Sequence, residues 1–279
     1  MIGVLLSVAL FLFLINARPA YAFATLVQQS NFGCACNSPG GIVSIPLLFS
    51  GTVTAGDVLV VGLAFVHLGG TFLSVCGGPP IMTVVCVVDA HGSRFTQVAA
   101  TGATTGSSAV LIYAATVPTC GNCIPSDEFT VTFLRGTFMD VYAYEVSGVS
   151  TVGLATGTGS GPGTIASTSP VSFTAGAFLL GFNIHDSGVS VTAGSGFTLN
   201  NDVIGISAAE YADPVSSPTT FPAILSGSVN WAEAGIALNP TLVPPISEYP
   251  LGLPLLALLA TVAYGVVRRR TCDSPKKMR

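Results

Sequence analysis

Two glutamates lie inside apolar runs, and a pair of such carboxylates could hydrolyse a glycosidic bond. Glu145 lies in YAYEVSG and Glu210 in SAAEYAD. Burial among apolar neighbours raises the pKa of a carboxyl group, as a general acid requires, and glycoside hydrolysis needs two facing carboxylates. However, no run carries two closely spaced acids, and Trp231 is the single tryptophan that could stack on a sugar. Because a glutamate near a strand end is more often a structural hydrogen-bond acceptor, we assign no catalytic residue and keep Glu145 and Glu210 as the pair to test if the protein is an enzyme.

The cysteines predict disulfides in an oxidising compartment. Six of the seven lie in the body of the chain, and they are Cys34, Cys36, Cys76, Cys86, Cys120 and Cys123. An even number in an exported protein favours up to three disulfides of undetermined pairing. The CAC and CGNC motifs leave two alternatives, a four-thiolate metal site and a redox pair. Cys272 lies in the basic tail and is expected to stay a thiol.

The remaining polar residues indicate no metal and no cofactor. His67, His91 and His185 have no spacing typical of metal ligands, and the last two lie in turn-forming DAHG and HDSG. The acidic loops lack the dense Asp spacing of dedicated calcium loops. Motifs of serine nucleophiles, phosphate loops and dinucleotide sites are absent, so we expect none of these chemistries.

Charge excludes some partners. Residues 23–248 contain twelve acids and two bases, Arg94 and Arg135, a formal net charge of −10. A lysine-free acidic segment is not expected to bind nucleic acid or anionic lipid surfaces.

The elements that would position these residues are short apolar runs separated by Gly, Pro, Asn and Asp, which predict an all-β fold, a single β-sandwich spanning residues 23–239. Thirteen strands are expected, at 42–50, 57–66, 82–89, 94–100, 108–117, 128–134, 138–148, 164–173, 177–186, 196–201, 203–212, 221–227 and 229–238. The runs 57–66 and 177–184 are apolar at consecutive positions, so we expect them to be buried on both faces. Residues 151–170 are polar and glycine-rich, and we interpret them as a long crossing loop that could carry O-linked glycans.

Both ends of the chain predict that the protein is exported and anchored in a membrane. An apolar run followed by Ala20-Tyr21-Ala22 is typical of a signal peptide, residues 1–22, although an uncleaved anchor is an alternative. A proline-rich stalk at 240–248 precedes an uncharged run at 249–267, long enough for one transmembrane helix. Arg268, Arg269 and Arg270 open the basic tail 268–279, which predicts a cytoplasmic C-terminus and an extracellular N-terminal domain.

The tail also carries a resemblance. Glu248, Tyr249, Pro250, Leu251 and Gly252, followed by the apolar run and the arginines, are similar to the C-terminal anchors of archaeal cell-surface proteins that archaeosortases and exosortases read. Those signals usually begin Pro-Glu-Phe or Pro-Glu-Tyr, whereas Ser247 stands in place of the proline here. The resemblance covers about 34 residues, from 246 to 279, and implies a surface location.

A second resemblance concerns the body of the chain. GDVLVVGLAF, VVDAHGSRFTQV, YAYEVSGV, AAEYA and the closing WAEAGIAL resemble a jelly-roll-like domain of uncharacterised prokaryotic surface proteins. In that family an Asp-x-x-Gly turn precedes an aromatic strand, which Asp89, Gly92 and Phe95 match. The resemblance implies a fold and no catalytic residues.

Together these features predict a single-pass cell-surface protein with a structural or adhesive role. Its expected partners are the bilayer, through the C-terminal helix, and a glycan or a neighbouring surface protein. One alternative is an extracellular filament assembled by strand exchange, for which the apolar segment Phe23 to Val27 would suit a donated strand. The other is a cell-surface glycoside hydrolase that uses Glu145 and Glu210.

Overall fold

Every regular element in the described part of this chain is a β-strand. The computed structural model describes residues 20–21, 23–36, 42–67, 72–73, 83–84, 86–89, 93, 95–102, 108–118, 128–134, 137–149, 154–200, 207–212 and 219–243. Residues Ala22–Thr241 form one compact unit, and the two flanking segments form another. In the flanking unit, β1 (Ala20–Tyr21) pairs antiparallel with β18 (Leu242–Val243).

The predicted signal peptide, apart from its last residues, and the predicted span at 249–267 lie outside the described residues. Within the described part of the chain, no helix is long and apolar enough to cross a membrane.

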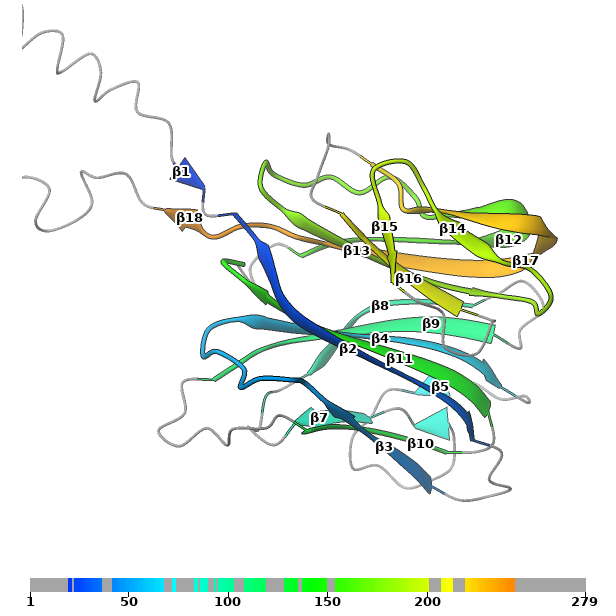
Figure 1. The fold of residues 1–279 in the computed structure, drawn as a ribbon, viewed down its shortest axis with the longest axis horizontal. Helices are drawn as coiled ribbons and strands as arrows, with labels where there is room; N and C mark the ends of the chain where they lie inside the picture. The colour runs from blue at the N-terminus through cyan, green and yellow to red at the C-terminus, as the bar shows by residue number, and fades with distance from the viewer. Residues whose placement is uncertain are drawn as a thin grey trace, which may run out of the picture. The chain divides into compact units, whose positions relative to one another are not determined.

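The first half of the compact unit builds a five-stranded and a three-stranded antiparallel sheet. The five-stranded sheet has the order β2 (Thr25–Cys36), β11 (Thr137–Ser147), β4 (Val58–His67), β9 (Ser108–Thr116) and β8 (Thr96–Gly102). The three-stranded sheet has the order β3 (Ile42–Leu48), β10 (Glu128–Leu134) and β7 (Cys86–Asp89). A short parallel pair, β5 (Phe72–Leu73) with β6 (Thr83–Val84), completes this half. Figure 1 shows the larger sheet lying over the smaller one.

The second half builds one six-stranded sheet from two very long strands and four shorter ones. Its order is β12 (Ala155–Ser167), β17 (Pro222–Leu238), β13 (Phe178–His185), β16 (Ser207–Ala212) and β15 (Thr198–Asn200). The start of β17 pairs with the end of β12 on one side and with β14 (Val191–Ala193) on the other. The rest of β17 pairs with the start of β12 and with β13.

The two halves repeat one strand pattern. The larger sheet of the first half runs β2-β11-β4-β9-β8, and in the second half the strands of the same chain order run β12-β17-β13-β16-β15. The small sheet β3-β10-β7 likewise matches the end of β12, the start of β17, and β14. We call these halves the first and second repeats. The repeats differ in one respect. The first repeat has separate strands β2 and β3, and β10 and β11, where the second has the continuous strands β12 and β17.

A turn of identical sequence fixes the alignment of the repeats. Thr54–Gly56 and Thr174–Gly176 both read Thr-Ala-Gly and lead into β4 and β13. In each turn the threonine carbonyl accepts a hydrogen bond from the amide three residues on, at 3.1 Å and 3.2 Å. Each glycine has a positive φ, 91° and 82°, which other residues rarely adopt. A residue of β4 therefore corresponds to the residue of β13 that lies 120 positions later.

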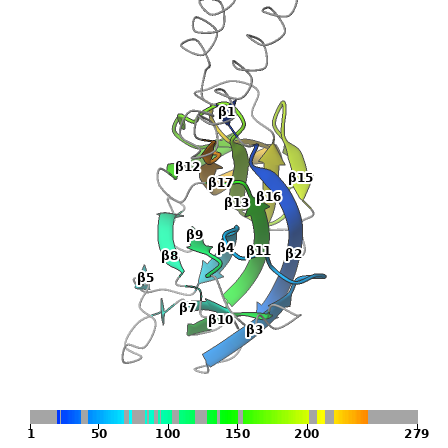
Figure 2. The same ribbon diagram turned by 90° about the vertical axis from the view of Figure 1, so that its left-hand side faces the viewer.

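The larger sheets of the two repeats face each other across the main core (Figures 1 and 2). At its centre the Phe182 ring lies against Gly62, and a Cβ at Gly62 would come within 2.2 Å of the ring. Tyr142 and Tyr144 flank this ring at centroid distances of 6.1 and 5.9 Å. The Tyr142 hydroxyl lies 2.9 Å from the Ser207 hydroxyl, which donates to Asp140 at 2.5 Å and so gives the core a polar contact between the repeats.

The prediction that the consecutive apolar runs are buried on both faces is confirmed. In β4, Val58 and Val60 face the main core, whereas Leu59 and Val61 pack in a second core with Val87 and Val131 of the small sheet. Every residue of β13 is buried as well.

The prediction of a crossing loop at 151–170 is wrong, because most of it forms β12. Alternate glycines of this strand let another segment lie directly on it. A Cβ at Gly159 would stand 2.0 Å from the Ser167 carbonyl oxygen, and one at Gly157 would stand 2.6 Å from that of Ser169. The glycines therefore serve close backbone approach within a sheet rather than loop flexibility.

Candidate functional site

Glu145 holds a loop in place. It is fully buried on β11 and accepts hydrogen bonds from the Thr54 amide at 2.6 Å and from the Gln28 side chain at 2.5 Å. Burial, and then the nearby Glu145 charge, raise the pKa of Asp57 to about 6. These contacts fasten the turn before β4, which agrees with the structural interpretation of Glu145.

The structure does not bring Glu145 and Glu210 together. On β11, Tyr144 and Val146 face the main core, so Glu145 projects from the opposite face of its sheet. On β16, Ala209 and Tyr211 face or border the main core, so Glu210 also projects away from it. The whole core separates the two carboxylates, so they cannot flank one glycosidic bond.

Glu210 instead lies beside a glutamate that the sequence interpretation overlooked. Glu233 on β17 lies across β13 from Glu210, with Gly181 between the two strands. The Cβ position of Gly181 is 2.9 Å from Glu210 Cγ and 3.1 Å from a carboxylate oxygen of Glu233. Glu233 is fully buried and Glu210 is 2% exposed. The missing side chain of Gly181 thus allows the two carboxyl groups to share one buried site.

Further polar groups border this pair. Asn183 and His185, on the same face of β13, are both 1% exposed. Among the described residues, the carboxylate oxygens of Glu210 and Glu233, Asn183 Oδ1 and His185 Nε2 form no hydrogen bond of standard geometry, although the Gly194 amide lies near Glu210 and the Asn183 side chain near Glu233. Asn183 Nδ2 donates to the Ala232 carbonyl at 3.4 Å, and His185 Nδ1 lies 2.9 Å from the Asp186 carbonyl.

Burial makes both glutamates weak acids. It raises the pKa of Glu210 to about 8, and the Gly194 amide only partly opposes this shift. Burial and then the neighbouring Glu210 charge raise the pKa of Glu233 well above its usual range, with Asn183 opposing. An isolated ionised carboxylate in an apolar interior is very costly, so such groups take up protons instead. The enclosed pair can hold protons, and in the folded chain its side chains are buried away from solvent.

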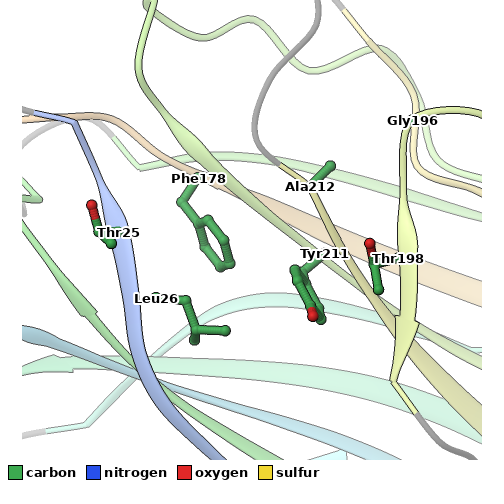
Figure 3. Close-up of a pocket in the computed structure, with 7 residues that line it drawn as sticks. All are labelled: Thr25, Leu26, Phe178, Gly196, Thr198, Tyr211 and Ala212. Carbon is green, nitrogen blue, oxygen red and sulfur yellow. The ribbon is translucent and has the colours of Figure 1, made fainter.

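A separate pocket of about 390 Å³ lies between β2 and strands β15 and β16. Its lining residues come from four segments and are Thr25, Leu26, Phe178, Gly196, Thr198, Tyr211 and Ala212. Figure 3 shows Leu26, Phe178 and Tyr211 facing the same space. The rings of Phe178 and Tyr211 stack with centroids 5.9 Å apart and an interplanar angle of 27°.

Three hydroxyl groups complete the pocket, from Thr25, Thr198 and Tyr211. Its lining residues include no Asp, Glu, His, Lys or Arg. Rings and uncharged hydroxyls together suit a neutral ligand that offers both apolar and hydroxyl surface.

Exposed apolar residues flank Thr25 and Leu26 in the chain, at the free edge of a sheet. Phe23 is 78% exposed and Val27 is 48% exposed. Strand β2 pairs with β11 along one side, and no described strand pairs with its other side. Figure 2 shows β2 at the outer edge of its sheet.

The other predicted site residues are only partly described. Cys34 and Cys36 lie in β2 and Cys86 begins β7, while Cys76, Cys120, Cys123 and Cys272 lie outside the described residues. The disulfides therefore remain a prediction. His67 ends β4, and His91 and the tail motif Glu248–Gly252 lie outside the described residues, as do Arg268, Arg269 and Arg270. Among described residues, no three His, Cys, Asp or Glu side chains gather as a metal site.

Two signals in the sequence could have identified the glutamate pair. Glu233 lies in WAEAGIAL, an apolar run of the same kind as those around Glu145 and Glu210. The repeated Thr-Ala-Gly turn would have aligned the halves and shown polar residues of the second at apolar positions of the first.

No family model, curated protein or solved structure matches this chain.

Proposed function

We propose that this chain is a membrane-anchored extracellular surface protein whose jelly-roll-like β-sandwich domain binds a neutral ligand at the pocket between β2, β15 and β16. The pocket is the main observation that supports this proposal. Its stacked Phe178 and Tyr211 rings and its three hydroxyl groups suit binding of a neutral ligand without catalysis. The predicted signal peptide, disulfides, C-terminal anchor and basic tail support the surface address. A glycan is the preferred ligand, because sugars present apolar faces and hydroxyls together.

The test is binding of neutral oligosaccharides to the full-length chain in detergent, with and without a blocked pocket. Thr198 is exposed on β15 and lines the pocket, so Thr198→Trp should fill it and lower affinity at least about tenfold, which corresponds to about 1.4 kcal/mol. Thr192→Trp, at an exposed threonine of β14 outside the lining, is the matched control. Equal binding by both variants would reject the pocket as the site.

Assembly through strand addition is a second candidate, favoured by the free edge of β2. This strand has twelve residues, TLVQQSNFGCAC, without a charge or a proline. Long uncharged edges readily accept a further strand unless they are protected. Thr25 and Leu26 already pair with β11, so β2 would act as the acceptor rather than the donor. Concentration-dependent oligomers that Val27→Lys disperses would support this candidate, and a monomer at all concentrations would reject it.

A further inference from the structure

The buried glutamate pair lies under a distinct layer of the second repeat, which we call the cover. It consists of residues 165–176, 189–197 and 219–225. The end of β12, β14 and the start of β17 hydrogen-bond to one another within it, and Val171 pairs with Thr219. The Phe221 ring reaches down onto the sheet, where a Cβ at Gly235 would come within 2.3 Å of it and one at Gly181 within 3.0 Å.

The fold itself does not require polar groups beneath this layer. By the alignment of the repeats, Asn183 and His185 correspond to Leu63 and Phe65 on β4. Glu233 pairs with Asn183 across the sheet, just as Val141 pairs with Leu63 in the first repeat, so Glu233 corresponds to Val141. Glu210 opposite Gly181 corresponds in the same way to Tyr113 opposite Val61.

All four counterparts in the first repeat belong to its apolar core against the small sheet. The same layer in the same protein is therefore apolar in one repeat and acidic in the other. Acidic residues at these positions weaken a core that apolar residues fill in the first repeat, so a property other than packing accounts for them.

The second repeat has no lysine or arginine that could neutralise the pair. Residues 151–248 contain no lysine and no arginine. The cover segments contribute no ionisable side chain, and within the described residues the sheet beneath adds His185. Asn183, whose Oδ1 has no hydrogen-bond partner among the described residues, lies next to the carboxylates and is 1% exposed. The arrangement can become neutral by taking up protons from solvent.

We propose that Glu210 and Glu233 form a proton-binding lock, which holds the cover on the sheet while the pair is protonated and loosens it when the protons leave. Each release transfers a proton from a carboxylic acid to solvent and leaves a carboxylate among apolar groups, next to a second acid. Water must then reach the pair, and the shortest route is displacement of the cover. The raised pKa values of both glutamates agree with this geometry.

The sign of the effect follows from proton linkage. The folded chain retains a proton on Glu210 up to a pH of about 8, whereas the unfolded chain loses it near 4.5. The contribution of Glu210 to the free energy of unfolding is therefore fully present below pH 4.5. It decreases as the pH rises from 4.5 to about 8. Across this window one retained proton changes the unfolding constant about tenfold per pH unit.

The single tryptophan provides a local readout. Trp231 is 9% exposed and packs with Ala166, Ala223 and Leu225 of the cover. Its fluorescence during urea unfolding of the full-length chain in detergent, at pH values between about 5 and 9, reports both the cover and the global transition. We compare the wild type with Glu210→Gln, Glu233→Gln and the double variant, in which glutamine mimics a protonated glutamate. Asp186→Asn, at an exposed acid of the same repeat, is the matched control.

We expect the ratio of wild-type to double-variant unfolding constants to rise about tenfold per pH unit for each retained proton, hence about a hundredfold while both glutamates stay protonated, and less steeply above pH 8, where Glu210 loses its proton. Asp186→Asn should keep the wild-type dependence. A ratio that does not change with pH would overturn the proposal. So would rescue of the wild type, but not of the single variants, by millimolar Ca²⁺ at alkaline pH, since the carboxylates would then hold a cation. If the double variant does not fold, the Trp231 emission of the wild type alone tests the proposal. A spectrum that does not change between pH 5 and 9 would show that the cover stays in place when the glutamates lose their protons.

Discussion

At the residue scale, the contact between Gly62 and Phe182 joins the two repeats. Phe182 is fully buried, and its ring occupies the space where a side chain at Gly62 would lie. Tyr142 and Tyr144 prevent the ring from moving aside, because they pack against it. A tightly packed interior of this kind accepts no additional methyl group without displacing its neighbours.

We therefore predict that Gly62→Ala lowers the free energy of unfolding by about 1–3 kcal/mol, as overpacked cores do. Urea denaturation of the full chain measures the change. Gly102→Ala is the control, because the nearest atom to its Cβ position lies 3.4 Å away. Equal losses in the two variants would mean that the Phe182 contact is not tight in solution.

At the element scale, the second repeat depends on β12 and its glycines. This strand pairs with β17 along almost its whole length, and the segment after it folds back over its own glycines. The close approach of the backbone at Gly159 brings Ser167 and Thr168 into the cover. The Thr168 hydroxyl then accepts a hydrogen bond from the Phe221 amide at 3.2 Å. One glycine position thus supports the layer that encloses the glutamates.

Gly159→Ala is expected to loosen the cover, because its Cβ would overlap the Ser167 carbonyl oxygen. Amide hydrogen exchange should increase in residues 165–171 and 219–225, with less change in β4 and β11. Thr158→Ala, at the exposed neighbouring position, should leave exchange unchanged. If Gly159→Ala also leaves the cover protected, the strand and the cover are not in direct contact.

At the scale of the whole molecule, we propose a membrane-anchored surface protein with two packed repeats. We expect the native protein, purified from its own membranes, to have a mass that begins at Phe23 and ends at Arg279. Three disulfides would lower this mass by six hydrogens, which a reductant restores. Intact-protein mass spectrometry measures all three features. A chain ending near Glu248 would indicate that the tail is a processing signal, and six free thiols would favour the metal interpretation of the cysteines.

The sequence by itself determined the all-β class and most strand positions, because turn residues and β-branched runs act locally. It also predicted the double-sided burial of β4 and β13, which their uninterrupted apolar composition requires. The polar edge strand β2 was not predicted, since TLVQQSNFG carries no apolar period and its order comes from pairing with β11.

Only the tertiary structure decided which residues meet. Glu145 and Glu210 have the same local pattern, yet they project on opposite sides of the core, because the two larger sheets pack face to face. Glu233 and Glu210 lie together because both strands pair with β13, and strand pairing joins residues that are far apart in the chain. The glycines of β12 predicted a loop because the residues that pack on them, Ser167 and Ser169, come close only in the folded chain.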